Sequence, residues 1–175
     1  MRILVTGGVR SGKSSHAEAL VGDGPATYVA AGPSPDVETD PDWAARVAAH
    51  QARRPASWKT LETQDLATAI REGLDPVLVD CLGTWLTAVV DEADAWDEDN
   101  DTVHDLVAAR VDEVVETLRD SALDVVLVTN EVGLGVVPEH RSGRLFRDLL
   151  GTVNQRVAAA CDEVHLVVAG RVLRL

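Results

Sequence analysis

The chain has 175 residues, of which 46% are hydrophobic and 26% are charged, a composition typical of a globular protein that buries its own core. The formal net charge of −13 at pH 7 argues against binding a nucleic-acid backbone, which requires a clustered basic surface. No apolar run is long enough for a membrane span or a secretory signal. Cys81 and Cys161 match no metal or redox spacing, so we expect a single domain, residues 1–175, in the reducing cytoplasm.

Short apolar runs rich in β-branched residues predict strands that are buried on both faces. They lie at residues 3–5, 26–29, 77–79, 125–128 and 164–168, with a possible terminal strand at 172–175. Helical periodicity predicts helices at 14–20, 42–51, 66–71, 82–90, 103–119 and 144–160. Asp40 and Pro41 suit the N-cap and first position of the second helix. This alternation predicts a single-domain α/β fold with a mostly parallel sheet flanked by helices, as in P-loop NTPases.

A phosphate-binding motif follows the first predicted strand and opens the first predicted helix. Its spacing is Gly-x-x-x-x-Gly-Lys-Ser, formed by Gly7, Gly8, Val9, Arg10, Ser11, Gly12, Lys13 and Ser14. The glycines allow backbone N–H groups to surround phosphate oxygens at a helix N-terminus. We expect Lys13 to reach the β- and γ-phosphates and Ser14 to bind Mg²⁺. The alternative is a glycine-rich turn with a chance Lys-Ser pair, but spacing and flanking elements all favour the motif.

Asp80 ends the predicted strand at 77–79, at the edge of a parallel sheet where ligands bind. A carboxylate there can orient the water shell of Mg²⁺ opposite Ser14, so Asp80 is a second candidate metal ligand. Its alternative role is to cap the helix that begins near Leu82.

His50 ends the predicted helix at 42–51 and is accompanied by Arg46, Arg53 and Arg54. A neutral imidazole can attack phosphorus, and arginines can neutralise the charge that develops on phosphoryl oxygens. A histidine near a helix C-terminus is also a common structural choice, because the helix dipole favours it. The residue types alone favour that structural role over the catalytic one.

Residues 91–105 contain eight carboxylates and no lysine or arginine. They follow no calcium-loop spacing, so a solvated loop is the favoured interpretation and metal ligation the alternative.

Four segments resemble the bifunctional adenosylcobinamide kinase/adenosylcobinamide-phosphate guanylyltransferase family of cobalamin biosynthesis. They are residues 3–14, residues 46–55 with Trp58, Thr60 and Glu62, residues 128–138, and residues 146–155. The phosphate loop is shared by many NTPases. The segment Asn-Glu-Val-Gly-x-Gly-x-Val-Pro, joined to Phe-Arg-Asp-x-x-Gly-x-x-Asn-Gln, is specific to this family, and the resemblance spans nearly the whole chain.

The resemblance implies two reactions. A phosphoryl group passes from ATP or GTP to the aminopropanol hydroxyl of adenosylcobinamide, and GMP from GTP is then joined to that phosphate. The family's guanylylated histidine corresponds to His50. The products would be adenosylcobinamide-GDP and pyrophosphate. The resemblance also implies that the protein forms a ring-like homotrimer.

The resemblance also implies further nucleotide contacts. They fall on Ala30, Ala31 and Gly32, on Gln51, Ala52, Arg53 and Arg54, and on Glu62. At 30–32 the family more often has Thr or Ser, so we expect backbone contacts there. A carboxylate such as Glu62 can accept hydrogen bonds from guanine N–H groups or ribose hydroxyls, although an exposed strand-end acid is the alternative.

Asn130 and Glu131 follow the predicted strand at 125–128, and we expect them near the corrinoid or the metal. Their alternative is a turn in which they bond the backbone of the glycine-rich segment 133–135. A last set of residues, on the final helix, is expected in helix packing or subunit contacts: Arg147, Asp148, Asn154 and Gln155. Two other functions stay open, a kinase for a different small alcohol with a structural His50, and a nucleotide-binding regulatory module.

Overall fold

The computed structural model describes residues 1–33 and 40–175, without the side chains of Trp43 and Arg46. Its centre is a seven-stranded sheet in the order β3-β2-β4-β5-β1-β6-β7. The strands are β1 (Arg2–Gly7), β2 (Ala26–Ala30), β3 (Trp58–Glu62), β4 (Val77–Asp80), β5 (Val125–Val128), β6 (Glu163–Val168) and β7 (Arg171–Arg174). All neighbours pair in parallel except β6 and β7, which pair antiparallel. The expected α/β fold with a mostly parallel sheet is confirmed.

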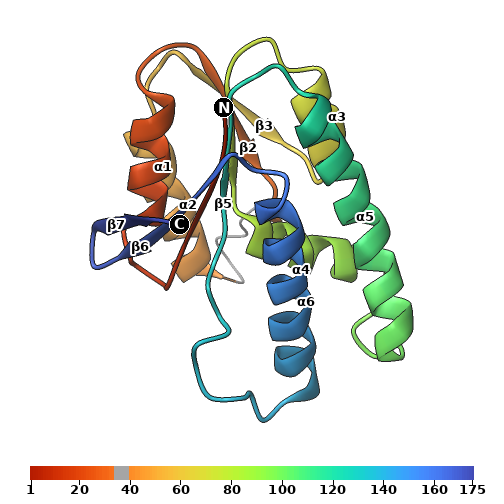
Figure 1. The fold of residues 1–175 in the computed structure, drawn as a ribbon. Helices are drawn as coiled ribbons and strands as arrows, with labels where there is room; N and C mark the ends of the chain where they lie inside the picture. The colour runs from red at the N-terminus through yellow and green to blue at the C-terminus, as the bar shows by residue number, and fades with distance from the viewer. Residues whose placement is uncertain (34–39) are drawn as a thin grey trace.

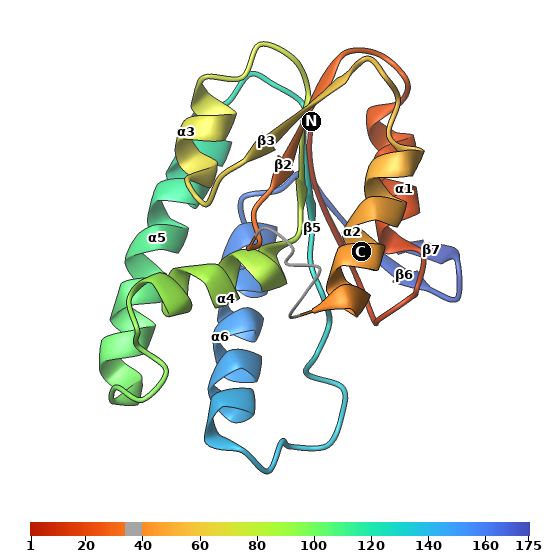
Figure 2. The same cartoon turned by 180° about the vertical axis from the view of Figure 1, so that it is seen from behind.

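Helices cover both faces of this sheet. They are α1 (Lys13–Val21), α2 (Pro41–Arg53), α3 (Leu66–Arg71), α4 (Leu82–Glu92), α5 (Asn100–Asp120) and α6 (Arg141–Ala158). Helices α1 and α2 lie on one side of the sheet and α3 to α6 lie on the other, as both opposite views show (Figures 1 and 2). No helix in the described ranges is long and apolar enough to cross a membrane.

Two hydrophobic cores result from the alternation of side chains along the strands. In β1, Ile3 and Val5 point into the core beneath α1, whereas Leu4 points into the larger core beneath α3 to α6. All four residues of β5 are buried, which is why its sequence is continuously apolar and contains no polar alternation.

One strand, β3, was not predicted. It lies at the edge of the sheet and pairs only with β2, and Trp58 is its one buried residue. The remaining side chains are exposed, so the segment has neither an apolar run nor a regular alternation by which a strand is recognised. Strand β3 is therefore recognised by its backbone pairing with β2 and not by its side-chain pattern.

The start of α2 agrees with the predicted cap, whereas the start of α5 does not. Helix α2 begins at Pro41, with the N–H of Ala44 bonded to the carbonyl of Asp40 at 3.0 Å. Helix α5 begins three residues earlier than expected, because Asp99 caps it by accepting from the N–H of Thr102 at 3.0 Å.

The strand order places three segments together at one edge of the sheet. The loop after β1 carries the phosphate motif, β4 ends at Asp80, and β5 lies between them and leads into Asn130. Ligands of parallel α/β sheets bind at this carboxyl edge.

Candidate active site

The backbone of the motif at 7–14 has the conformation that phosphate loops require. Gly12 has φ +96° and Arg10 has φ +56°, so the chain curls through left-handed positions before α1 begins at Lys13. The amine of Lys13 donates to the carbonyl of Gly8 at 3.3 Å. The loop therefore places backbone N–H groups and the Lys13 amine at the N-terminus of α1.

Contacts with neighbouring segments hold this loop in place. The N–H of Gly170 donates to the carbonyl of Ser11 at 2.8 Å, and the N–H of Glu131 donates to the carbonyl of Gly7 at 3.1 Å. A Cβ atom at Gly7 would lie 2.4 Å from the carbonyl oxygen of Val167. Glycine is needed there because strands β1 and β6 approach too closely for any side chain.

A cavity of about 290 Å³ opens beside the loop. Ten predicted site residues line it: Val9, Lys13, Ser14, Ala30, Gly32, His50, Gln51, Arg54, Glu62 and Asp80. They come from five elements and three loops, so the fold brings together groups that are up to 71 positions apart between Val9 and Asp80. Residues that the sequence analysis missed also line it, among them Tyr28, Cys81 and Thr84.

The other predicted residues lie around the cavity without lining it. Gly7, Gly8, Arg10, Ser11 and Gly12 form the backbone of the loop. Ala31 is fully buried in the larger core. Ala52 is exposed on α2, and Arg53 reaches the site through its contact with His50.

His50 lies in the last turn of α2 among charges of both signs. Its Nδ1 atom is 3.4 Å from Nη2 of Arg53 and 3.7 Å from Oδ2 of Asp80. Arg53 also pairs with Glu18 at 3.0 Å. Because arginine can only donate, Nδ1 accepts in this arrangement, which requires the proton of a neutral ring to lie on Nε2.

Burial lowers the pKa of His50; the nearby Asp80 carboxylate opposes this shift, and Arg53 adds to it. The neutral, nucleophilic form is therefore favoured near pH 7. The expected ring of three arginines is only partly described: Arg53 touches the imidazole, Arg54 turns away to other partners, and the side chain of Arg46 lies outside the described part of the chain. The carboxylates of Asp80 and Glu18 were not expected near the imidazole.

Arg54 and Tyr28 form a second polar pair in the cavity wall. The guanidinium carbon of Arg54 lies 3.4 Å from the centre of the Tyr28 ring, and Nη1 donates to the Thr60 hydroxyl at 2.9 Å. Trp58 also stacks with Tyr28, and the centres of the two rings are 6.4 Å apart. Burial raises the pKa of Tyr28, so its hydroxyl stays protonated. Tyr28 lies in an apolar strand, and nothing in its sequence context distinguishes it from a core residue.

Asp80 is placed to bind a cation. Its Oδ2 atom is buried and has no hydrogen-bond partner in the described residues, and it shares the cavity wall with Ser14. The alternative capping role is wrong, because the N-cap of α4 is Cys81, whose backbone N–H donates to the Thr84 hydroxyl oxygen at 3.4 Å. A carboxylate and a hydroxyl facing one cavity fit Mg²⁺, which keeps several waters.

Asn130 and Glu131, which follow β5, differ in their contacts. Glu131 takes the turn role, since its Oε1 accepts from the N–H of Gly133 at 2.7 Å, whereas Asn130 lines the cavity. Arg147 on α6 donates to the carbonyls of Gly133 and Gly135 at 2.8 and 3.1 Å. Arg147 therefore contacts the glycine-rich segment after β5, and its role in helix packing or subunit contacts stays a prediction.

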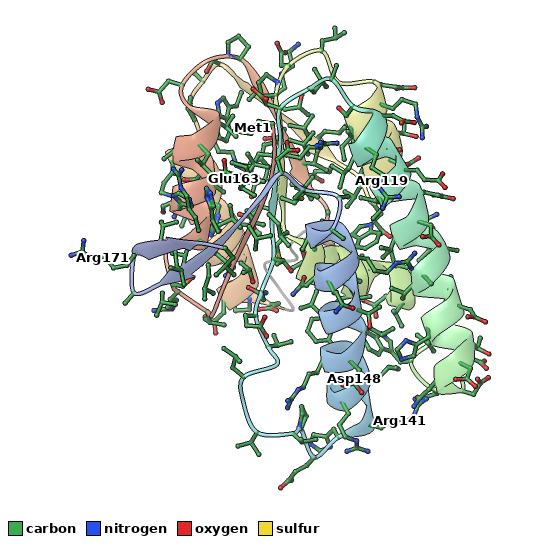
Figure 3. All side chains as sticks on the ribbon, viewed as in Figure 1. Met1, Arg119, Arg141, Asp148, Glu163 and Arg171 are labelled. Atoms are coloured by element: carbon green, nitrogen blue, oxygen red, sulfur yellow. The ribbon has the colours of Figure 1, made fainter. Side chains whose placement is uncertain are left out.

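Residues 91–105 serve the local structure. Asp91 accepts from the indole N–H of Trp96 at 2.5 Å, and Asp99 caps α5. Arg141, at the start of α6 (Figure 3), donates to the backbone carbonyls of Trp96 and Glu98. No group of three or more His, Cys, Asp or Glu residues suited to a metal occurs in the described residues.

Comparisons with known proteins agree with this geometry. Residues 3–175 match the family described as cobinamide kinase / cobinamide phosphate guanyltransferase. The chain is 44% identical to the bifunctional adenosylcobalamin biosynthesis protein CobU of Salmonella typhimurium and 41% identical to that of Escherichia coli, over 97% of each chain. It is 36% identical to the bifunctional protein CobP of Pseudomonas aeruginosa, over 97% of this chain and 94% of the relative. The chain therefore belongs to the cobinamide kinase / cobinamide phosphate guanyltransferase family, which is a family of enzymes.

Proposed function

We propose that this chain catalyses two successive transfers in cobalamin biosynthesis. The first moves the γ-phosphoryl group of ATP or GTP to the hydroxyl of adenosylcobinamide, and the second joins GMP from GTP to the new phosphate. The observation that carries the proposal is that Lys13 of the phosphate loop and His50 border one cavity, in a chain that belongs to this family. The names of the relatives, bifunctional adenosylcobalamin biosynthesis proteins, support it.

Different parts of the cavity wall would bind the two ends of the nucleotide, the triphosphate and the nucleoside. The loop at 7–14 supplies backbone N–H groups and Lys13 for the triphosphate. The nucleoside lies toward Gln51, Arg54 and Glu62, with backbone contacts from residues 30–32. Arg53 acts on His50, and the exposed position of Ala52 leaves it only a backbone contribution.

Ser14 and Asp80 would hold Mg²⁺, which is supported by the buried Oδ2 of Asp80, an atom near His50 that has no hydrogen bond in the described residues. When bound, the cation neutralises charge on the phosphate oxygens. His50, Arg53 and Asp80 then act at the α-phosphate end, and Lys13 at the other.

In the guanylyl step a ring nitrogen of His50 attacks the α-phosphorus of GTP. A P–N bond forms, the bond from the α-phosphorus to the bridging oxygen breaks, and pyrophosphate leaves. An oxygen of adenosylcobinamide phosphate then attacks the same phosphorus, releasing His50 and giving adenosylcobinamide-GDP. The lowered pKa of His50 supports the first attack, because it keeps the imidazole neutral. Two displacements at one phosphorus retain its configuration.

The test is to incubate wild type and His50→Ala with Mg²⁺ and GTP labelled at the α-phosphate, and to measure label on denatured protein. We expect acid-labile, base-stable label on wild type and none on His50→Ala. The matched control is His140→Ala, since His140 is an exposed histidine outside the cavity wall, and it keeps the label. Phosphorylation of adenosylcobinamide should persist in all three proteins.

No label on wild type would favour a kinase without a covalent intermediate. Loss of both activities in a folded His50→Ala protein would refute the division of labour between His50 and the phosphate loop.

The remaining proposals concern the whole protein. We take residues 1–175 as one domain, a view supported by the continuous sheet from β3 to β7. A homotrimer follows from the family resemblance and is tested by sedimentation velocity. The unpaired cysteines support a cytoplasmic location, and the charge of −13 supports small phosphorylated substrates over nucleic acid.

A further inference from the structure

Asn130 occupies the central position at the edge of the sheet where the proposed chemistry takes place. Strand β5 lies between β1, which leads to Lys13, and β4, which ends at Asp80. Asn130 follows β5 by two residues and lines the same cavity as those two side chains. Asn130 therefore follows the strand that lies between those leading to the proposed phosphate-binding lysine and the proposed metal-binding carboxylate.

A buried polar network fixes the backbone that carries this side chain. The hydroxyl of Thr129 donates to Oδ1 of Asn154 at 2.6 Å, and Nδ2 of Asn154 donates to the carbonyl of Asn130 at 3.1 Å. Thr129 is fully buried, and its own N–H donates to the carbonyl of Val5 at 2.9 Å. The oxygen and the nitrogen of the Asn154 side-chain amide thus bond two consecutive residues, Thr129 and Asn130. Because Asn154 lies on α6 and Thr129 also bonds β1, this network fixes the backbone of Asn130 relative to both elements.

Gly83, in the first turn of α4, lies next to the side-chain amide of Asn130. A Cβ atom at Gly83 would lie 3.2 Å from Nδ2 of Asn130, a contact that would displace the amide by a few tenths of an ångström. Position 83 has ordinary helical geometry, with no positive φ, so the backbone itself does not demand glycine. The absent side chain leaves room for the Asn130 amide.

From these contacts we infer that Asn130 donates a hydrogen bond from Nδ2 to an oxygen of the γ-phosphoryl group during its transfer, with Asn154 as the residue that positions it. This inference rests on the proposed kinase function and deepens it. A neutral donor on a fixed backbone, in the same cavity as Lys13, stabilises charge on the phosphoryl oxygens with little reorganisation during the reaction. Asn154 touches no substrate and acts only through Asn130.

A double-mutant cycle on the phosphorylation of adenosylcobinamide tests both roles. Asn130→Ala should lower kcat about 100-fold, the usual cost of removing one such donor, with little change in the KM for ATP. Asn154→Ala should lower kcat by a smaller factor. The double variant should be no slower than Asn130→Ala, because the positioning residue has nothing left to position.

Two further variants keep the test decisive. Thr152→Ala is the matched control, since the exposed Thr152 hydroxyl bonds only the carbonyl of Asp148 within α6 among the described contacts, and it should retain wild-type kcat. Gly83→Ala favours the helix and crowds Asn130, so it should lower kcat in the wild-type background and have no effect in the Asn130→Ala background. If Asn154→Ala fails to fold, the double-mutant cycle of Gly83→Ala with Asn130→Ala replaces the cycle of Asn154→Ala with Asn130→Ala.

Multiplicative losses in the double variants, or an unchanged kcat in Asn130→Ala, would overturn the inference while leaving the proposed function intact. A wild-type protein that phosphorylates no corrinoid would instead overturn the proposed function, and the inference with it.

Discussion

Lys13 is the residue whose role depends least on its distant neighbours. It is the first residue of α1 and its amine already lies over the loop, 3.3 Å from the carbonyl of Gly8. Both proposed reactions need a triphosphate held by this loop, so one substitution should affect both.

We therefore expect Lys13→Ala to lower both corrinoid phosphorylation and labelling of His50 by about 100-fold or more. The chain offers a natural control in Lys59, its other lysine, which is exposed on β3, and Lys59→Ala should leave both rates near wild type. The two assays described above measure them. Full guanylyl transfer by Lys13→Ala would show that GTP does not bind at this loop.

At the scale of elements, the backbones of β1 and β6 approach each other closely where Gly7 pairs with Val167. A Cβ atom at Gly7 would meet the backbone oxygen of Val167 at 2.4 Å, which no rotamer change relieves. Gly7→Ala should therefore destabilise the protein by about 1–3 kcal/mol, as overpacked sites do. Gly8→Ala meets nothing within 4 Å and should change the free energy of unfolding far less. Urea unfolding of both variants measures the difference, and equal stabilities would contradict this explanation.

Helix α1 is joined to β6 through a pair of histidines. Nε2 of His16 lies 2.9 Å from Nδ1 of His165, whose Nε2 lies 2.8 Å from Glu163, and Arg174 on β7 is the other charged group acting on this site. Burial lowers the pKa of His16, and the charges of His165 and Arg174 add to the shift.

A lowered histidine pKa means that the unfolded chain binds the proton more tightly than the folded protein. The stabilisation is complete above the ordinary histidine pKa of about 6.5 and is lost as the pH falls through the lower folded value. We expect urea unfolding to show lower stability at pH 5.5 than at pH 7.5, with a smaller difference in His16→Asn. His50 contributes in the same direction, so part of the dependence should persist. An identical pH dependence in His16→Asn would exclude this origin.

At the scale of the whole molecule, the two cores meet at the central strands. Leu127 on β5 is fully buried in the larger core, whereas Leu74, between α3 and β4, is 91% exposed. Leu127→Ala should cost about 2–5 kcal/mol through lost burial and the resulting cavity. Leu74→Ala should stay within about 0.5 kcal/mol of wild type. Chemical denaturation measures both, and a small loss at Leu127 would mean that the core relaxes around it.

Local patterns in the sequence were sufficient for the central strands, most helices and the phosphate loop. Residues 125–128 form a strand because a run of four apolar residues can be buried on both faces. The loop at 7–14 is recognisable because its chemistry lies within eight consecutive residues. The family, too, was readable from motifs that are contiguous in the chain.

Tertiary structure alone decided the features that depend on distant partners. Edge strand β3 exists through its pairing with β2, and Tyr28 lines the cavity together with Arg54, which packs over its ring. The charges around His50 come from α1, α2 and the end of β4, and Asn154 reaches Asn130 across 24 positions of sequence. Periodicity and spacing record what a residue's neighbours in the chain require, whereas burial, charge and hydrogen bonding at a site depend on which segments the fold brings into contact.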